Sequence, residues 1–345
     1  MRNFILMGLS IAFLTACSGG EPGRPDDAVV QGVHYIGVTV SDIEQSEAFY
    51  EKVGDLKKVD NTEMQDQSLM EHLVGKTGLE MSTSVIRGVN AQLRLMQFDN
   101  PTMAASNANP VKVYGPGIAH LAFQVNETTD AYPTFLKEGG RHIGAVEMWK
   151  NPKTQVSYAY GYDRDNIIVE IEHVDVAALN LETPPKNTHR IRQIALSTPD
   201  IDRAVDFYSH LLQEAHPRRT GWLNMSGDAV DMVTGEQDSE LRFAWFQVRN
   251  LELEIIEYVS HPTEVPKEPR PFDALGYNIM MFDVTDLSAV RERLLAAGGS
   301  IVSEGRELDG APVLLARDLD GNLLGFQKLP DDSPLSSQNF SGNGL

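Results

Sequence analysis

Apolar and polar positions follow two periods along this chain, and the two periods occur in a fixed order. Residues 33–40 are β-rich, and they lead into a helical pattern over residues 43–53. Residues 118–125 are β-rich in the same way, and their helical pattern ends at Gly139-Gly140, where a left-handed residue suits a helix C-terminus. Each helix is followed by strand-like segments, of which the clearest are 91–98 and 167–171. The pattern predicts a unit of one strand, one helix and two or three further strands.

A long internal repeat shows that this unit occurs four times. Asp42-Ile43, five residues and Phe49-Tyr50 recur as Asp200-Ile201, five residues and Phe207-Tyr208. Each copy also divides into two halves of the same design. Strands and a helix in this order favour an α+β fold with curved, mainly antiparallel sheets and helices packed outside them.

The repeats divide the chain. We expect a flexible Gly- and Pro-rich tether, two repeated domains joined by a linker that contains Thr183-Pro184-Pro185, and a polar, disordered tail after Pro330. The expected boundaries are 18–30 for the tether, 31–174 for the first domain, 175–189 for the linker, 190–330 for the second domain and 331–345 for the tail.

Residues 1–17 have the features of a targeting segment. A short positive start precedes an apolar run from Phe4 to Leu14, which is too short for an ordinary transmembrane helix. The following Leu14-Thr15-Ala16-Cys17 resembles the lipobox of bacterial lipoproteins, whose cysteine carries the lipid. This resemblance implies lipidation at Cys17 and a lipid-anchored protein of the cell envelope, facing the periplasm in a Gram-negative cell. The alternative is an ordinary signal peptide cut nearby.

Charge and cysteine content limit the kinds of binding partner and covalent link that this chain can have. The formal charge of -20 argues against nucleic acid, which would repel the chain. Cys17 is the single cysteine, so internal disulfides are excluded. Apart from the expected lipid anchor, these features identify no binding partner, and they do not define an oligomeric state.

Candidate chemistry lies in the first copy of the repeat. His34, His120 and Glu170 stand at equivalent points of its half-repeats, where the second copy has Arg192, Ile279 and Gly325. Two imidazoles and a carboxylate are the ligand set of a non-haem metal site with open coordination positions. We therefore expect a metal in the first copy and a degenerate site in the second.

These motifs resemble the vicinal oxygen chelate superfamily, which includes glyoxalase I, methylmalonyl-CoA epimerase, extradiol dioxygenases and bleomycin-resistance proteins. The resemblance rests on the strand-opening histidine, on the Asp-Phe-Tyr motif, and on two late turns at 318–322 and 163–166. It implies four βαβββ modules in two tandem domains, with metal ligands from the first and last strands of each module.

The resemblance also implies roles for individual residues. His34 and His120 would face each other across one pair of modules, with Glu170 as the third ligand and Glu172 as a fallback. Many family members have a glutamate at the position of Arg94. Here Arg94 either pairs with a nearby acid or holds an anionic substrate through a bidentate contact.

The expected activity is that of a metal-dependent enzyme on a small substrate with vicinal oxygens, most concretely an extradiol-type ring cleavage. Tyr160 supports ring cleavage, because this tyrosine lies ten residues before Glu170, as an active-site tyrosine does in those dioxygenases. The absence of a histidine from residues 100–117 weakens the ring-cleavage hypothesis, because no acid–base group is then available there. An isomerase or lyase and a non-catalytic binding protein are the alternatives. Fe(II) or Mn(II) is favoured as cofactor, with Zn, Ni and Co as further options.

The second copy retains one ligand-type residue, Glu254, which does not make a site alone. We expect that copy to be a scaffold, an interaction surface or a metal-free pocket. Residues that could line such a pocket are Arg218, Arg219, Trp222, Arg242 and Trp245.

Overall fold

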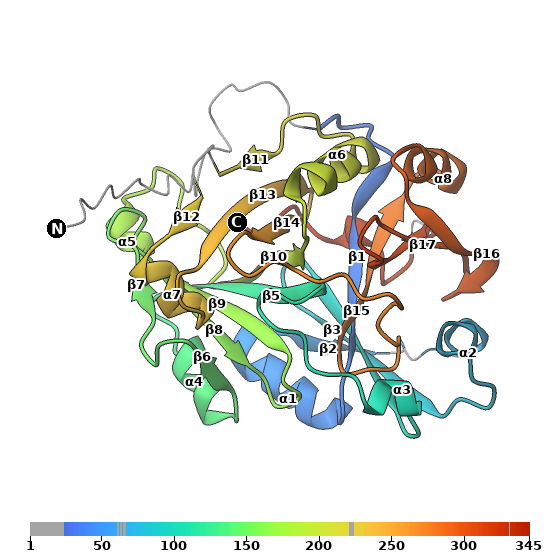
Figure 1. Cartoon of the computed structure of the whole chain (residues 1–345), viewed down its shortest axis with the longest axis horizontal. Coiled ribbons are helices and arrows are strands. Elements are labelled where there is room, and N and C mark those ends of the chain that lie inside the picture. Colours follow the sequence, from blue (N-terminus) through green and yellow to red (C-terminus); the bar gives the residue numbers. More distant parts are fainter. Residues whose placement is uncertain (1–23, 61, 63, 65–66, 221–223, 331) are drawn as a thin grey trace.

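The computed structural model describes residues 24–345 except 61, 63, 65–66, 221–223 and 331, so the targeting segment, Cys17 and Trp222 lie outside the described residues. Within this part of the chain the strands form two large sheets with helices packed beside them, which confirms the α+β fold (Figure 1). No helix among the described residues has both the length and the apolar character that crossing a membrane requires.

The eight-stranded sheet contains, in spatial order, β16 (Ser300–Leu308), β17 (Ala311–Arg317), β18 (Leu323–Gln327), β15 (Gly276–Val284), β1 (Val30–Thr39), β4 (Gln92–Phe98), β3 (Met81–Arg87) and β2 (Lys57–Val59). The main path of the ten-stranded sheet contains β11 (Arg218–Arg219), β13 (Glu240–Val248), β14 (Leu251–Tyr258), β10 (His189–Ser197), β5 (Gly117–Asn126), β9 (Ile168–Val174), β8 (Val156–Tyr162) and β6 (Arg141–Ile143), while β12 (Met225–Ser226) pairs with β13 and β7 (Trp149–Lys150) pairs with β8. The helices are α1 (Ile43–Gly54), α2 (Ser68–Val74), α3 (Met103–Ser106), α4 (Ala131–Lys137), α5 (Val176–Leu179), α6 (Ile201–Leu212), α7 (Asp228–Thr234), α8 (Leu287–Ala296) and the 3-10 turn η1 (Ser337–Asn339).

Each sheet is built from both halves of the chain. Strand β1 pairs antiparallel with β15, and β5 pairs antiparallel with β10. The first module therefore shares a sheet with the fourth, and the second module shares a sheet with the third. The expectation that His34 and His120 face each other across one module pair is wrong, because their strands lie in different sheets.

The repeated Asp-Phe-Tyr motif begins a helix and connects that helix to the late turn of the next module. Asp42 caps α1 by accepting a hydrogen bond from the backbone N–H of Gln45, which satisfies one of the free donors at a helix start. The hydroxyl of Tyr50, at the other end of α1, donates to Asp163 in the late turn of the next module at 2.9 Å. In the second copy, Tyr208 donates to Asp318 in the same way at 2.7 Å.

The main core lies on one face of both sheets. Alternation along the strands sends side chains such as Phe123 and Phe246 of the ten-stranded sheet, and Phe282 and Phe326 of the eight-stranded sheet, into one buried cluster. Helices α1, α4, α6 and α8 contribute their apolar faces to the same cluster. The opposite face of each sheet is therefore available for other contacts.

The C-terminal tail is packed, although its polar composition led us to expect disorder. Leu335, Ser337 and Phe340 are buried. The backbone N–H of Ser337 donates to Asp283 of β15, and Arg249 donates to the carbonyl of Phe340 at 2.9 Å. The tail spans the junction of the two sheets because side chains of both satisfy its backbone polar groups.

Candidate metal centre

Four neighbouring strands of the ten-stranded sheet each present one polar side chain at the same level. These side chains are His120 on β5, Glu170 on β9, Gln193 on β10 and Glu254 on β14, and all four are buried. The strands lie in the order β14, β10, β5 and β9. We call the face of the sheet that carries these four residues the site face.

The strand register arranges the four residues with approximate two-fold symmetry. Ala122 lies opposite both Glu170 and Gln193, and Ala195 lies opposite both His120 and Glu254. The two alanines occupy the middle of the arrangement, so no large side chain separates the four polar groups.

The polar groups converge within short distances. The Nε2 atom of His120 lies 3.2 Å from Oε2 of Glu170 and 3.4 Å from Oε2 of Glu254. The side-chain amide of Gln193 donates to the same two oxygens at 3.0 and 2.9 Å. One ligand atom each from His120, Glu170 and Glu254 fits within 4.8 Å of the others.

Two buried atoms of this group lack a well-formed hydrogen bond. Nε2 of His120 is buried without a hydrogen bond of acceptable geometry, and Oε1 of Gln193 is buried without a hydrogen-bond partner. A side-chain amide can turn over to exchange its oxygen and nitrogen. Imidazole, two carboxylates and an amide oxygen are all metal ligands, so the residues present fit a divalent ion.

The same geometry determines how His120 behaves without an ion. Burial lowers the pKa of His120, but the close approach of the Glu170 and Glu254 carboxylates to its ring raises it by more, to about 9. At neutral pH the imidazolium therefore neutralises part of the charge of the two carboxylates. A metal ion would have to replace this proton.

Tyr160 lies beside the group, where the sequence placed it. It is opposite Glu170 on β8, and its ring centroid is 4.8 Å from that of His120. Burial and the charge of Glu170 raise the pKa of Tyr160 well above its usual range. The phenol is thus neutral, and it can donate a hydrogen bond but cannot serve as a base near pH 7.

A row of ion pairs borders the group on one side, with its inner members Glu172 and Arg192 buried and its outer members half-buried. Glu172 pairs with Arg192, Arg192 with Glu252 at 3.1 Å, and Glu252 with Arg218 at 2.8 Å. Glu172, the fallback ligand, is also bonded by Gln124 at 2.7 Å. It therefore belongs to this ion-pair row, while Glu170 is the carboxylate beside His120.

The structure places His34 and Arg94 in the eight-stranded sheet, apart from this group. His34 is fully buried at an irregularity of β1, and both its ring nitrogens are without a hydrogen-bond partner. Burial and the nearby cations Arg94 and Arg87 hold the pKa of His34 well below its usual range. Arg94 pairs with Asp309 through two contacts of 2.6 and 3.0 Å, as the first of its two alternatives expects.

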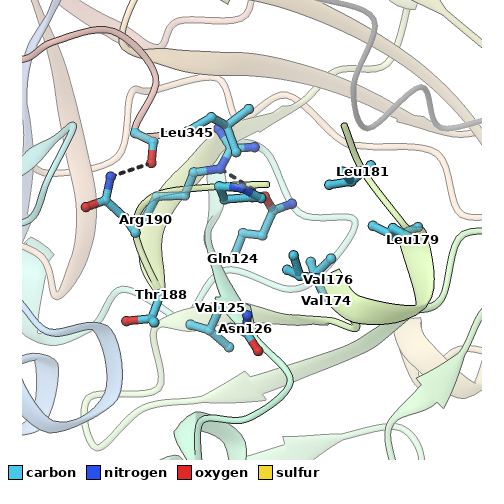
Figure 2. A pocket seen from close by; sticks show the side chains of 13 residues that line it. Gln124, Val125, Asn126, Val174, Val176, Leu179, Leu181, Thr188, Arg190 and Leu345 are labelled. Carbon is cyan, nitrogen blue, oxygen red and sulfur yellow. Dashed lines mark hydrogen bonds between the residues drawn. The ribbon is translucent and has the colours of Figure 1, made fainter. Parts of the chain in front are cut away.

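A small pocket lies further along the site face, where β5 and β9 end. Gln124 and Arg190 line its base, and Leu179, Leu181 and Leu345 line its apolar part (Figure 2). Its volume is about 30 Å³. That space holds about one water molecule, so it does not qualify as a substrate site.

Sequence reasoning missed Gln193 and assigned Glu254 to no site. An irregularity of β10 lies between Ile191 and Gln193, so the residue that reaches the site comes one position after Arg192. Glu254 was recognised as a ligand type, but its partners come from the other half of the chain. The candidate group therefore takes residues from both copies, whereas the sequence placed the expected metal ligands in the first copy alone.

Comparison with known proteins defines the family. The Glyoxalase/Bleomycin resistance protein/Dioxygenase superfamily profile matches residues 32–171 and 190–326, and the chain belongs to this superfamily. The fold is similar to that of glyoxalase I from Zea mays, with a TM-score of 0.56, 15% identity and coverage of 86% of this chain and 92% of that one. It is also similar to a Bacillus subtilis protein proposed to be a dioxygenase, with a TM-score of 0.55, 11% identity and coverage of 90% and 89%. No curated protein matched the chain.

Proposed function

We propose that this protein is a metal-dependent isomerase or lyase that acts on a small substrate with vicinal oxygens. The observation that carries the proposal is the buried convergence of His120, Glu170 and Glu254, with Gln193 beside them. Burying two adjacent carboxylates is costly unless a cation compensates their charge. The imidazolium of His120 compensates part of this charge, and a divalent metal ion in place of its proton would compensate both carboxylates.

The composition of the ligand group favours this chemistry over ring cleavage by O₂. The arrangement typical of non-haem Fe(II) oxygenases has two histidines and one carboxylate, whereas this group has one histidine and two carboxylates. Oxygen-rich sites suit Mn(II), so Mn(II) is the preferred ion of the two that the sequence favoured. Extradiol-type cleavage, which the sequence placed first, now comes second.

The residues around the group suit the stabilisation of negative charge on a bound substrate, and the carboxylate of Glu170, which lies opposite Tyr160, would accept the proton that the substrate loses next to its carbonyl. A divalent ion held here would act as a Lewis acid toward a substrate oxygen that gains negative charge. The neutral phenol of Tyr160 would donate a hydrogen bond beside His120. The buried position of the group excludes water, which strengthens both interactions.

The test uses the metal-loaded protein with a panel of small α-hydroxy carbonyl compounds in D₂O, followed by NMR. We expect metal-dependent exchange of the proton next to the carbonyl, or conversion of the compound, and no O₂ uptake with catechols. The control variant His120→Ala should show neither reaction. Catechol-dependent O₂ uptake would overturn the assignment in favour of the dioxygenase. An intact protein that binds metal and small ligands without turnover would favour a binding role.

We also propose that the protein is anchored in the cell envelope through a lipid on Cys17. The support is the sequence of residues 1–17. The first described part of the chain lies against α6, where Arg24 donates to the carbonyl of Leu212 at 2.8 Å and Gln213 accepts from the backbone of Val29 at 2.7 Å. Metabolic labelling with a fatty acid should mark the wild type and not Cys17→Ala. Labelling of both forms, or of neither, would reject lipidation at this residue.

A further inference from the structure

Trp245 contacts the one carboxylate oxygen of Glu254 that faces away from the metal group. It lies opposite Glu254 in the register of β13 and β14, and its indole Nε1–H donates to Oε1 of Glu254 at 2.6 Å. The other oxygen, Oε2, faces His120 and accepts from Gln193. The two oxygens of this carboxylate therefore have separate partners.

Two other side chains contact the indole ring of Trp245. Phe243 stacks on it with a centroid distance of 5.3 Å and an interplanar angle of 7°. The guanidinium of Arg218 lies 4.2 Å from the indole centroid, and Arg218 is itself paired with Glu252 at 2.8 Å. The buried indole thus has little freedom to turn, and its single donor remains directed at Glu254.

We propose that Trp245 is a positioning residue that holds Glu254 as a ligand through one oxygen only. This inference rests on the proposed metal-binding function. An indole is a donor and never an acceptor, so it keeps Oε1 occupied whatever ion is present. Partners of this kind orient ligands, and their loss typically weakens metal binding about 10–100-fold.

The carboxylate of Glu170 provides an internal comparison. The strand residue opposite it is Tyr160, whereas the residue opposite Glu254 is Trp245. The four polar side chains are thus arranged with approximate two-fold symmetry, but the residues opposite the two carboxylates differ. A change at Trp245 should alter one of the two carboxylates and leave the other in place.

The experiment compares Trp245→Phe with Trp149→Phe. The first change removes the donor while it keeps an aromatic ring in contact with Phe243 and Arg218. Trp149 is the matched control, because it lies in the same sheet and stacks on Tyr158 at 6.0 Å. Affinity for Mn(II) is measured by competition with a chromophoric chelator, and the Co(II)-substituted proteins are compared by visible absorption.

We expect Trp245→Phe to bind Mn(II) about 10–100-fold more weakly than the wild type, and Trp149→Phe to bind it equally well. Freed from the indole, Glu254 can use both oxygens, so the Co(II) bands should weaken as the coordination number rises. A third variant, Trp245→His, restores a ring N–H near the same place and should recover part of the affinity. Circular dichroism of each metal-free variant reports whether it folds.

The outcomes separate this inference from the proposed function. Wild-type protein that binds no metal would overturn both. Wild-type protein that binds Mn(II), with an unchanged affinity and Co(II) spectrum in Trp245→Phe, would overturn only the role of Trp245. Equal losses in Trp245→Phe and Trp149→Phe would also overturn it, since they would indicate a general packing effect.

Discussion

Metal binding should strengthen as the pH rises, because the ion and a proton compete for Nε2 of His120. In the metal-free protein the pKa of His120 is about 9, because Glu170 and Glu254 outweigh the effect of burial. In a solution at pH 7, the pKa of His120 is about two units above the pH. Each unit corresponds to about 1.36 kcal/mol, so displacing the proton costs about 2.7 kcal/mol, or about 100-fold in affinity.

The assay is a competition titration with Mn(II) between pH 6 and pH 8.5, using a chelator of known affinity at each pH. We expect the association constant to rise about tenfold per pH unit in this range. The pKa itself can be followed in the metal-free protein through the ring signals of His120 by NMR. His120→Ala identifies those signals.

An affinity that does not change between pH 6 and pH 8 would refute this reasoning, as would a measured pKa for His120 near 6.5 or below. Ionisation of the neighbouring Glu172 does not cancel the expected dependence of metal affinity on pH. Burial raises its pKa to about 7, against the opposing effect of Arg192. Its ionisation adds negative charge near the ion as the pH rises, so it makes the dependence steeper and not flatter.

Three further predictions concern stability. Asp309→Asn leaves the buried Arg94 without its anion, and urea unfolding should show a loss of about 3–5 kcal/mol, whereas a loss below about 1 kcal/mol would mean that Arg94 has other compensation. Gly54→Ala places a methyl group 2.3 Å from the ring of Phe123, so a loss of about 1–3 kcal/mol is expected, and an unchanged midpoint would show that the ring can move. Because the pKa of His120 is raised on folding, its protonation contributes about 3 kcal/mol to the free energy of unfolding of the metal-free protein. This contribution is complete below pH 6.5 and is lost as the pH rises through 9. A free energy of unfolding that increases over this interval would contradict the raised pKa.

Local features of the fold could be predicted from the sequence because local interactions determine them. Asp42 and Asp200 begin their helices by capping them, and both are visible in the repeat. The pairing of β1 with β15 and of β5 with β10 could not be predicted, because it depends on which strand edges meet across long separations in the chain. The repeat alone favoured pairing within each copy.

The site could be predicted in part. His120 and Glu170 were identified, and the structure brings them together. Gln193 was missed because an irregularity shifts the register of its strand by one residue, and Glu254 was set aside because its partners lie in the other copy. His34 occupied a convincing sequence position, yet its strand belongs to the other sheet. The pairing of strands between modules, and not the residue type, therefore determines which of the predicted ligands lie together.

The most direct test of the central claim is elemental analysis of the purified wild type, His120→Ala and His34→Ala after exposure to Mn(II) and removal of excess ion. If His120, Glu170 and Glu254 hold the metal, the wild type and His34→Ala should retain about one ion per chain, and His120→Ala should retain none. Circular dichroism should confirm that each variant is folded. Loss of the ion in His34→Ala, or its retention in His120→Ala, would contradict the metal centre described above.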